Sequence, residues 1–377
     1  MSIDVLLFFS DEKSREKEQE SEELKIDPTA GPLGFESLLL TEEHDLGDFE
    51  FNSICLLHKK KLVKILPHPS SPSTHLLTIG DDGFLRNYSV DQMKIEKFYL
   101  ISSKPLTCFQ SISARSSLDN DELHPLAIIG SFDQRIYFHN LTSGTSIFSE
   151  QLHDDSIVGL YVTRRSPNVL LLTASADATV RFWLLDNLLS MQADEYIFNP
   201  DASSSSSISI EHEIQFEASC TTMDVQEQHE LLAVACQDGS IHLCHFRGET
   251  SFKRFQSSKP ILSVSLRSDG TSLVYLCSEY LTIIDITTDA ETFRANSTNP
   301  TRSFSSFFYS PKMLLIALTN GSCDVWNLRI REKVLTLNIS GTCAINTITY
   351  NDGMFFLGSE DGYLYSYVFA SRQSASL

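Results

Sequence analysis

The sequence predicts an all-β fold over residues 49–377, a propeller of seven four-stranded blades. Three observations predict it. Short runs rich in β-branched and aromatic residues recur along the chain, and polar turns bound them. This pattern is typical of β-strands. A polar, usually acidic, turn residue recurs with them at intervals of 40 to 61 residues, which makes seven units. Finally, only eight residues follow Phe369, too few to complete the last unit, whereas a spare strand precedes the first.

The most complete unit runs from His153 to Trp183. We expect its strands at Ile157–Val162, Val169–Ala174 and Thr179–Leu184, with a tight turn at Ser175–Ala178. A His before the first strand, an Asp in the turn and a Trp closing the third strand resemble one WD40 repeat, the blade of a β-propeller.

In WD40 repeats a Ser or Thr of the second strand links the His to the Trp, so that four side chains form one hydrogen-bonded network. Carried over by position, this structural tetrad would be Asp177, His153, Thr173 and Trp183. Such a network satisfies polar groups that would otherwise be buried unpaired.

The turn position can be followed through all seven units. It is occupied by Asp82, Asp133, Asp177, Asp238, Ser278, Asn320 and Asp361. Six residues later, only Trp183 and Trp326 keep a tryptophan, so the repeats are divergent. Several blades should therefore be held by packing more than by the full polar network. Longer insertions are expected at Ser111–His124 and Asn187–Ile214, the second with a polar, flexible loop at Ser203–Ser207.

The two ends of the repeat region suggest how the ring closes. The last blade lacks its outer strand, and Phe51–Leu56, just before His58, is the available one. We expect this strand to pair with the segment around Val368 and to remove an exposed sheet edge.

Residues 1–48 differ from the rest and form an acidic lead-in. Asp11–Leu24 carries seven acidic and three basic residues without an apolar face, which is typical of a disordered segment. Pro28 and Pro32 would break any helix that formed there.

Composition excludes some classes of function. The net charge of −20, from 29 basic and 49 acidic residues, argues against non-specific nucleic-acid binding. Eight cysteines without a C-x-x-C spacing indicate reduced, buried thiols. Without a signal-peptide pattern or a long apolar run, we expect a soluble, cytoplasmic protein.

Four segments carry a resemblance beyond the repeat. They read HKKKLVKI, FLRNYSVDQMKIEKFYLISSKPLTCF, SFDQRIYFHNLTSGTSIFSEQLHDDSIVGL and MDVQEQHELLAVACQDGSIHL. They resemble the C-terminal propeller of FAN-type BEACH–WD40 proteins, FAN being the factor associated with neutral sphingomyelinase activation. The similarity covers about residues 34–369 and includes the acidic lead-in GFESLLLTEEHDLGDFEF. It implies a monomeric cytoplasmic adaptor that docks partner proteins, with peripheral membrane association through them and a link to membrane-associated signalling. The PH-like and BEACH domains of that family have no counterpart in residues 1–48, so the chain is either part of a longer protein or a shortened relative.

Chemistry-bearing clusters are few. His153-Asp154-Asp155 could suggest acid–base chemistry, but its place before a strand favours the tetrad. Cys236, His242, Cys244 and His245 could form a loose zinc set, yet the alternation of side chains places His245 on the opposite strand face. We therefore expect no metal and no cofactor.

Two surface segments have a functional and a plain interpretation. Lys59-Lys60-Lys61 with Lys64 could touch anionic lipid, although a solvated blade edge is the simpler interpretation. Ser203–Ser207 could be phosphorylated, with a plain linker as the default.

Two classes of function remain open. The first is a non-catalytic protein-interaction scaffold, and the second is a propeller enzyme or ligand-binding protein that uses the central channel. The expected innermost strands ILSVSL, SFSSFFYS and INTITY are poor in catalytic groups, which favours the scaffold. Binding is then expected through loops that gather at one end of the ring. These loops are Asp81–Gly83, Ser131–Gln134, His153–Ser156 and Gly358–Gly362.

Overall fold

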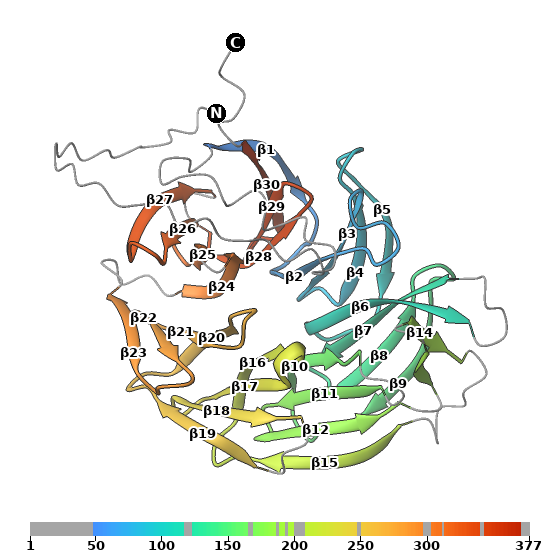
Figure 1. Cartoon of the computed structure of the whole chain (residues 1–377). Helices are drawn as coiled ribbons and strands as arrows, with labels where there is room; N and C mark the ends of the chain where they lie inside the picture. Colours follow the sequence, from blue (N-terminus) through green and yellow to red (C-terminus); the bar gives the residue numbers. More distant parts are fainter. Residues whose placement is uncertain are drawn as a thin grey trace, which may run out of the picture.

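The computed structural model describes residues 48–116, 123–164, 169–185, 188–192, 195–199, 208–246, 250–296, 303–310, 313–339 and 343–370. Within these ranges the chain forms seven β-sheets arranged in a ring, a seven-bladed propeller (Figure 1). The predicted fold class is confirmed. The predicted disorder of residues 1–48 and the predicted loop at Ser203–Ser207 fall almost entirely outside the described residues.

The blades follow one another along the chain, and each runs from its innermost strand outward. Blade 1 contains β2 (Leu62–Pro67), β3 (His75–Gly80), β4 (Phe84–Ser89) and β5 (Lys94–Leu100). Blade 2 contains β6 (Leu106–Ser116), β7 (Leu123–Ser131), β8 (Arg135–Asn140) and β9 (Thr145–Gln151). Blade 3 contains β10 (Ile157–Val162), β11 (Leu170–Ser175), β12 (Thr179–Leu184) and β15 (Ser209–Gln215).

The remaining four blades repeat this order. Blade 4 contains β16 (Cys220–Gln226), β17 (Leu231–Cys236), β18 (Ser240–His245) and β19 (Ser251–Gln256), with a 3-10 turn at Glu227–His229. Blade 5 contains β20 (Ile261–Leu266), β21 (Ser272–Cys277), β22 (Tyr280–Asp285) and β23 (Glu291–Asn296). Blade 6 contains β24 (Ser303–Ser310), β25 (Met313–Leu318), β26 (Ser322–Asn327) and β27 (Glu332–Asn338). Blade 7 contains β28 (Ile345–Asn351), β29 (Met354–Ser359), β30 (Tyr363–Ala370) and the N-terminal strand β1 (Asp48–Leu56).

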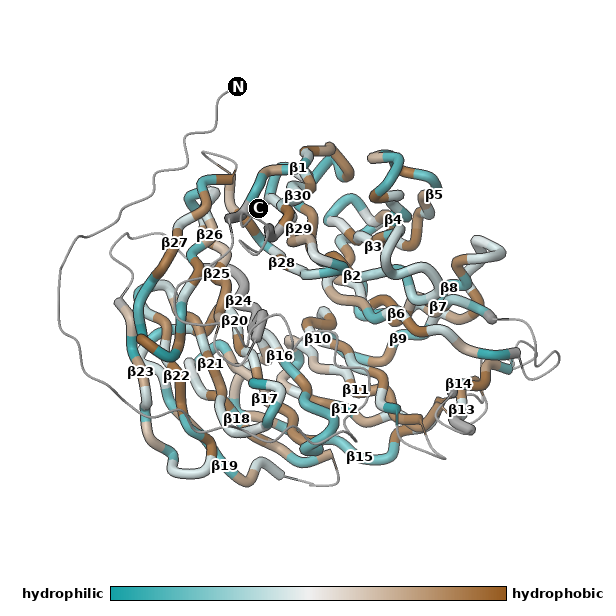
Figure 2. The backbone as a smooth tube through the Cα atoms, turned by 45° about the horizontal axis from the view of Figure 1, so that its top comes forward, coloured by the Kyte–Doolittle hydropathy of each residue, from teal (hydrophilic) through white to brown (hydrophobic). Residues whose placement is uncertain are grey.

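Burial follows the position of a strand in its blade. Every residue of the second strands β11, β17 and β25 is buried, because both faces of these strands pack against neighbouring blades. The outer strand β19 instead alternates between half-buried and exposed residues, as expected where one face meets solvent. Figure 2 shows the same trend, with the most hydrophobic stretches in the middle strands. The core is therefore divided into clusters that lie between adjacent blades.

Closure of the ring agrees with the prediction. β1 pairs antiparallel with β30, placing Glu50 opposite Val368 and Phe51 opposite Tyr367. The hydroxyl groups of Ser53 and Ser366 also lie 2.7 Å apart across this pair. Because β1 comes from the start of the propeller and β30 from its end, opening the ring would require breaking a full strand pair.

The two long insertions meet in space, which the sequence pattern did not indicate. Part of the second insertion forms a hairpin, β13 (Leu189–Gln192) and β14 (Glu195–Phe198). β14 pairs in parallel with the extended end of β6, with Tyr196 opposite Ala114. Blade 2 thereby becomes a six-stranded sheet that borrows a hairpin from the chain of blade 3.

Candidate interaction face

One end of the ring carries two kinds of segment, and we call it the turn face. Each blade is an antiparallel sheet traversed in the same direction, so the turns between second and third strands lie at the same end as the connectors between blades. The described turns are residues 81–83, 132–134, 176–178, 237–239, 278–279, 319–321 and 360–362. The connectors include residues 57–61, 101–105, 152–156, 216–219 and 257–260. All four predicted binding loops belong to this face.

Backbone hydrogen bonds link turns and connectors into a rim. At its start, a connector donates to the turn of the blade it leaves, as Ser102 N does to Gly83 O at 3.4 Å. At its end, it accepts from the turn of the blade it enters, as Pro105 O does from Phe132 N at 2.9 Å. The connectors that begin at Leu57, Leu152 and Phe216 repeat both contacts. The backbone of this face is therefore fixed by hydrogen bonds between main-chain groups of the turns and the connectors.

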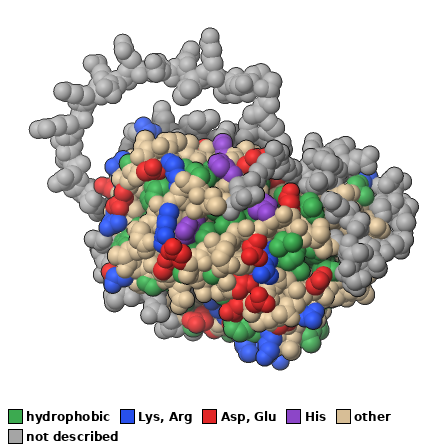
Figure 3. Space-filling view, turned by 90° about the horizontal axis from the view of Figure 1, so that it is seen from below, with side chains coloured by type: hydrophobic (Ala, Val, Ile, Leu, Met, Phe, Trp, Pro, Cys, Tyr) green, Lys and Arg blue, Asp and Glu red, His purple; other side chains and the backbone are tan. Residues whose placement is uncertain are grey.

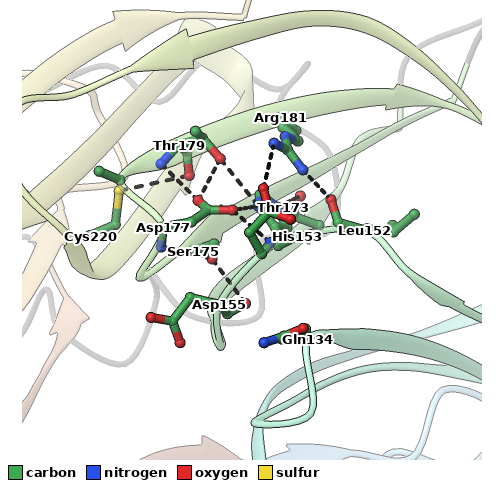
Figure 4. A network of polar contacts seen from close by, with 12 residues as sticks. Gln134, Leu152, His153, Asp155, Thr173, Ser175, Asp177, Thr179, Arg181 and Cys220 are labelled. Carbon is green, nitrogen blue, oxygen red and sulfur yellow. Dashed lines mark hydrogen bonds and ion pairs between the residues drawn. The ribbon is translucent and has the colours of Figure 1, made fainter.

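The tetrad residues of blade 3 lie in one chain of hydrogen bonds, of which Figure 4 labels Thr173, His153 and Asp177. Trp183 Nε1 donates to Thr173 Oγ1 at 2.9 Å, and Thr173 Oγ1 lies 2.7 Å from His153 Nε2. His153 Nδ1 lies 2.9 Å from Asp177 Oδ2. Because the indole can only donate, Thr173 donates onward to His153, which in turn donates from Nδ1 to the carboxylate. The chain is consistent with a neutral imidazole.

The Asp177 carboxylate also orders the turn around it. It accepts from the N–H groups of Asp154 at 3.1 Å and Thr179 at 3.0 Å, and from the Thr179 hydroxyl at 2.6 Å. Burial alone would raise the pKa of Asp177, but these hydrogen bonds and His153 outweigh it and lower the pKa. Burial lowers the pKa of His153, although Asp177 opposes that shift. These side chains use their hydrogen-bonding groups to stabilise the blade and do not form a surface site.

Blade 1 holds a second version of this network that sequence reasoning missed. His58 Nε2 lies 3.0 Å from Thr78 Oγ1, and His58 Nδ1 lies 2.8 Å from Asp82 Oδ1. Arg86 adds an ion pair of 2.9 Å to the same carboxylate. The signal was present, because the separations from His58 to Thr78 and on to Asp82 equal those in blade 3. Tyr88 stands at the Trp position of this blade, so the His, Thr and Asp were not recognised as parts of a tetrad.

The other blades stabilise their turn residue with different partners. In blade 2, Asp133 accepts from the hydroxyls of Ser102 and Tyr137, both at 2.6 Å. In blades 4 and 6, the hydroxyls of Ser240 and Ser322 donate to Asp238 and Asn320 at 2.7 and 2.6 Å. In blade 7, the Ser359 hydroxyl donates to Asp361.

Blade 5 departs from the predicted pattern. Its turn is only Ser278 and Glu279, one residue shorter than the three-residue turn of blade 3. The hydroxyl of Tyr280 instead lies 2.9 Å from the Ser257 hydroxyl in the adjoining connector. A tyrosine hydroxyl thus makes the contact between turn and connector that an acidic residue makes elsewhere.

The first turn residue of several blades presents its side chain outward. Phe132, Gln237 and Glu360 are exposed, and Phe132 is 58% exposed. Their N–H groups are the ones that donate to the connectors. An aromatic side chain held this far out of the core by a fixed backbone has the properties of an interface anchor.

Charge on the surface is mixed. On the face drawn in Figure 3, acidic and basic side chains are interspersed and form no continuous basic field. Such a surface does not favour a polyanion as ligand on that side.

Two innermost strands each carry a charged residue: Asp224, which the sequence analysis overlooked, and Lys64, which it grouped with Lys59–Lys61 as a solvated blade edge. Lys64 on β2 and Asp224 on β16 belong to innermost strands, and Asp224 Oδ2 accepts from Leu266 N at 2.6 Å. Burial lowers the pKa of Lys64 and raises that of Asp224, with each weakly opposing the other's shift. The signal was a single charge within an otherwise uncharged strand, in LVKILP and in CTTMDVQ. Asp224 has an evident structural role, because it caps the inner edge of blade 5.

The zinc interpretation of blade 4 finds no support in the geometry. Among the described residues, no group of three His, Cys, Asp or Glu side chains is placed to hold a metal ion. His242 instead lies against the Phe216 ring, with centroids 4.7 Å apart, and 3.0 Å from the Ser240 hydroxyl. All eight cysteines are free thiols.

Buried histidines predict how stability depends on pH. Because burial lowers the pKa of His58, His68, His139 and His153 below 6.5, the unfolded chain binds more protons than the folded chain as the pH falls through this range. We expect the free energy of unfolding, measured by urea denaturation, to fall below pH 6.5 by at most about 1.4 kcal/mol per pH unit for each such histidine. A further fall is expected below pH 3.8, where the unfolded chain binds protons at Asp82 and Asp177 while their lowered pKa values keep both carboxylates charged in the folded state. His153→Gln should reduce the slope between pH 6.5 and 5, and an unchanged slope would contradict the neutral assignment.

Comparisons with known proteins add no identity. No protein-family model and no curated protein matches this chain. No helix in the described part of the chain is long and apolar enough to cross a membrane.

Proposed function

We propose that this chain is a non-catalytic protein-interaction scaffold whose turn face binds partner proteins. The observation that carries the proposal is the division of roles within the turns. Their backbones and hydrogen-bonded acidic side chains hold the ring together, while the side chains of Phe132, Gln237 and Glu360 are exposed. Binding sites usually consist of such side chains on loops that a rigid scaffold positions.

The kind of partner follows from this surface. Phe132 supplies an apolar anchor, and the exposed Gln237 and Glu360 supply polar groups on other turns of the same face. A short protein segment with one aromatic or Arg side chain would complement them, and its affinity should depend on few residues. The resemblance to FAN-type BEACH–WD40 propellers suggests a cytoplasmic, monomeric adaptor, linked to membranes or to sphingomyelinase signalling through its partners.

The test compares partner capture by two matched variants of the full chain. The first changes Phe132, Gln237 and Glu360 to Ala on the turn face. The control changes Met93, Ser268 and Ile330 to Ala, which are exposed in turns at the opposite end of the blades. We expect the first variant to lose captured partners by about tenfold or more, as for loss of an interface anchor, and the control to lose none. If the turn-face variant keeps the wild-type denaturation midpoint and every partner, the binding face is wrong.

A second candidate, a ligand site in the central channel, is favoured by one observation. Asn346, on the innermost strand β28, is 9% exposed, and neither its amide nitrogen nor its amide oxygen has a hydrogen-bond partner in the described residues. Buried polar groups normally have partners, so a small polar ligand is a reasonable occupant. Thermal shift screening with polar metabolites would test it, with Asn346→Leu expected to abolish any shift. A turnover of substrate by the pure protein would overturn the scaffold proposal itself.

A further inference from the structure

An apolar surface lies on the outer part of blade 1, on the side that faces blade 7. Phe98 and Leu100 on the outer strand β5 are 67% and 62% exposed, the two highest values among the large apolar side chains of the described residues. The Phe98 ring lies 6.2 Å from that of Phe84, over which the Arg86 guanidinium is placed at 4.7 Å. We call Phe84, Arg86, Phe98 and Leu100 the blade-1 patch.

The strand register shows which way this patch faces. Leu85 and Tyr99, which alternate with patch residues, pack into the cluster between blades 1 and 2. The patch residues therefore point the other way, toward blade 7. Cys55 of β1 and Ile95 of β5 pack against one common cluster, so the outer strands of blades 7 and 1 lie on either side of that cluster. β1 is thus the neighbour of the patch.

Charge distinguishes this region from the rest of the protein. Residues 57–105, which contain blade 1, carry eight Lys and Arg against four Asp and Glu, a net charge of +4 in a chain of −20. Exposed Lys59 and Lys60 stand on the connector from β1, whereas Lys94 and Lys97 of β5 alternate with Ile95 and Phe98 and face blade 2. A ligand for this surface should be acidic and should carry apolar side chains.

The chain contains a segment with that chemistry next to the patch. Residues 34–47, GFESLLLTEEHDLG, carry four acidic residues and no Lys or Arg, together with Phe35 and Leu38–Leu40. They immediately precede β1, which begins at Asp48. We propose that residues 34–47 fold back along β1 and dock on the blade-1 patch, with Phe35 or the leucines against Phe98 and Leu100.

Reach and concentration both allow this contact. β1 has nine residues, about 30 Å of strand, and fourteen extended residues span up to about 45 Å. A tethered segment of this length acts at an effective concentration in the millimolar range. Modest attraction between −4 and +4, together with burial of two apolar side chains, is then sufficient for docking. The contact would shield the patch until an acidic partner or a change in salt displaced the segment, and it does not depend on the proposed function.

Zero-length cross-linking of the full chain tests the proposal. A carbodiimide joins Lys amines to carboxylates in contact, and mass spectrometry identifies the pairs in the monomer isolated by gel filtration at low protein concentration. We expect Glu36, Glu42, Glu43 or Asp45 to join Lys59 or Lys60. Lys333 of blade 6 lies on the other side of blade 7 and measures how often an undocked, freely moving segment is cross-linked. Docking on blade 1 predicts about tenfold fewer cross-links to Lys333 than to the blade-1 lysines.

Matched variants separate docking from charge attraction alone. Phe98→Ser with Leu100→Ser should reduce the blade-1 cross-links about tenfold, because it removes the apolar contact and leaves every lysine. The control, Ile210→Ser with Phe252→Ser, changes exposed side chains on the outer strands of blades 3 and 4 and should leave the cross-links unchanged. Denaturation midpoints check that both variants are folded.

Several outcomes would overturn the proposal. Equal cross-linking to Lys333, or cross-links that persist in the Phe98 and Leu100 variant, would mean that the segment does not use the patch. Cross-links found only in a dimer fraction would assign the patch to a second copy of the chain. Binding of the pure protein to phosphatidylserine vesicles, with no intramolecular cross-links, would assign it to a lipid surface.

Discussion

Replacement of Gly362 by Ala is expected to lower the free energy of unfolding by about 3–5 kcal/mol. Gly362 has a φ of +88°, and a Cβ atom there would lie 2.1 Å from the backbone oxygen of His58. Its own carbonyl accepts from Leu57 N and His58 N at 3.0 and 3.1 Å. A side chain would therefore impose left-handed strain and also push away the connector that joins β1 to blade 1.

A second glycine of the same blade separates these two effects. Gly353 has a φ of +80°, and a Cβ atom built on it meets nothing within 4 Å. Gly353→Ala should cost only the strain of the backbone, about 1–2 kcal/mol. Urea denaturation of both variants measures the difference. Equal losses would show that the contact between turn and connector does not stabilise the ring.

Trp183→Phe is expected to destabilise the protein by about 1–3 kcal/mol, because Thr173 Oγ1 loses the indole donor that lies 2.9 Å away. The second tryptophan is a natural control. Trp326 occupies the same position in blade 6 and is also half-buried, but its indole N–H has no partner among the described residues. Ile316 stands where blade 3 has Thr173 and cannot accept a hydrogen bond.

Trp326→Phe should therefore cost less than about 1 kcal/mol, since it removes an unsatisfied donor along with some packing. Chemical denaturation monitored by far-UV circular dichroism compares the two variants without relying on tryptophan fluorescence. A Trp183 variant no less stable than the Trp326 variant would contradict the importance of the tetrad hydrogen bonds in blade 3.

The number of blades, the pairing of the N-terminal strand and most strand positions followed from the sequence. Strand alternation, turn residues and a repeat of about 40 residues are local properties, and each is written into neighbouring residues. The tetrad candidates in blade 3 could be named for the same reason, because separations along the strands set which side chains meet.

Contacts in which one residue type takes the place of another, and contacts between segments far apart in the sequence, could not be predicted in this way. Tyr280 reaches Ser257 across a shortened turn, and Tyr137 replaces a histidine as a partner of Asp133, since a long hydroxyl side chain can reach a site from several positions. The hairpin β13–β14 pairs with β6 although about eighty residues separate them, and no local pattern encodes such a pairing.

The sequence by itself determined the seven-bladed ring, its closing strand and the polar network of blade 3, because repeated local patterns specify them. Only the tertiary structure decided which residues are left exposed on that ring. In the sequence, Phe132 and Phe98 cannot be distinguished from the phenylalanines of the core. Their exposure depends on whether a neighbouring blade covers them, which is a property of packing between blades.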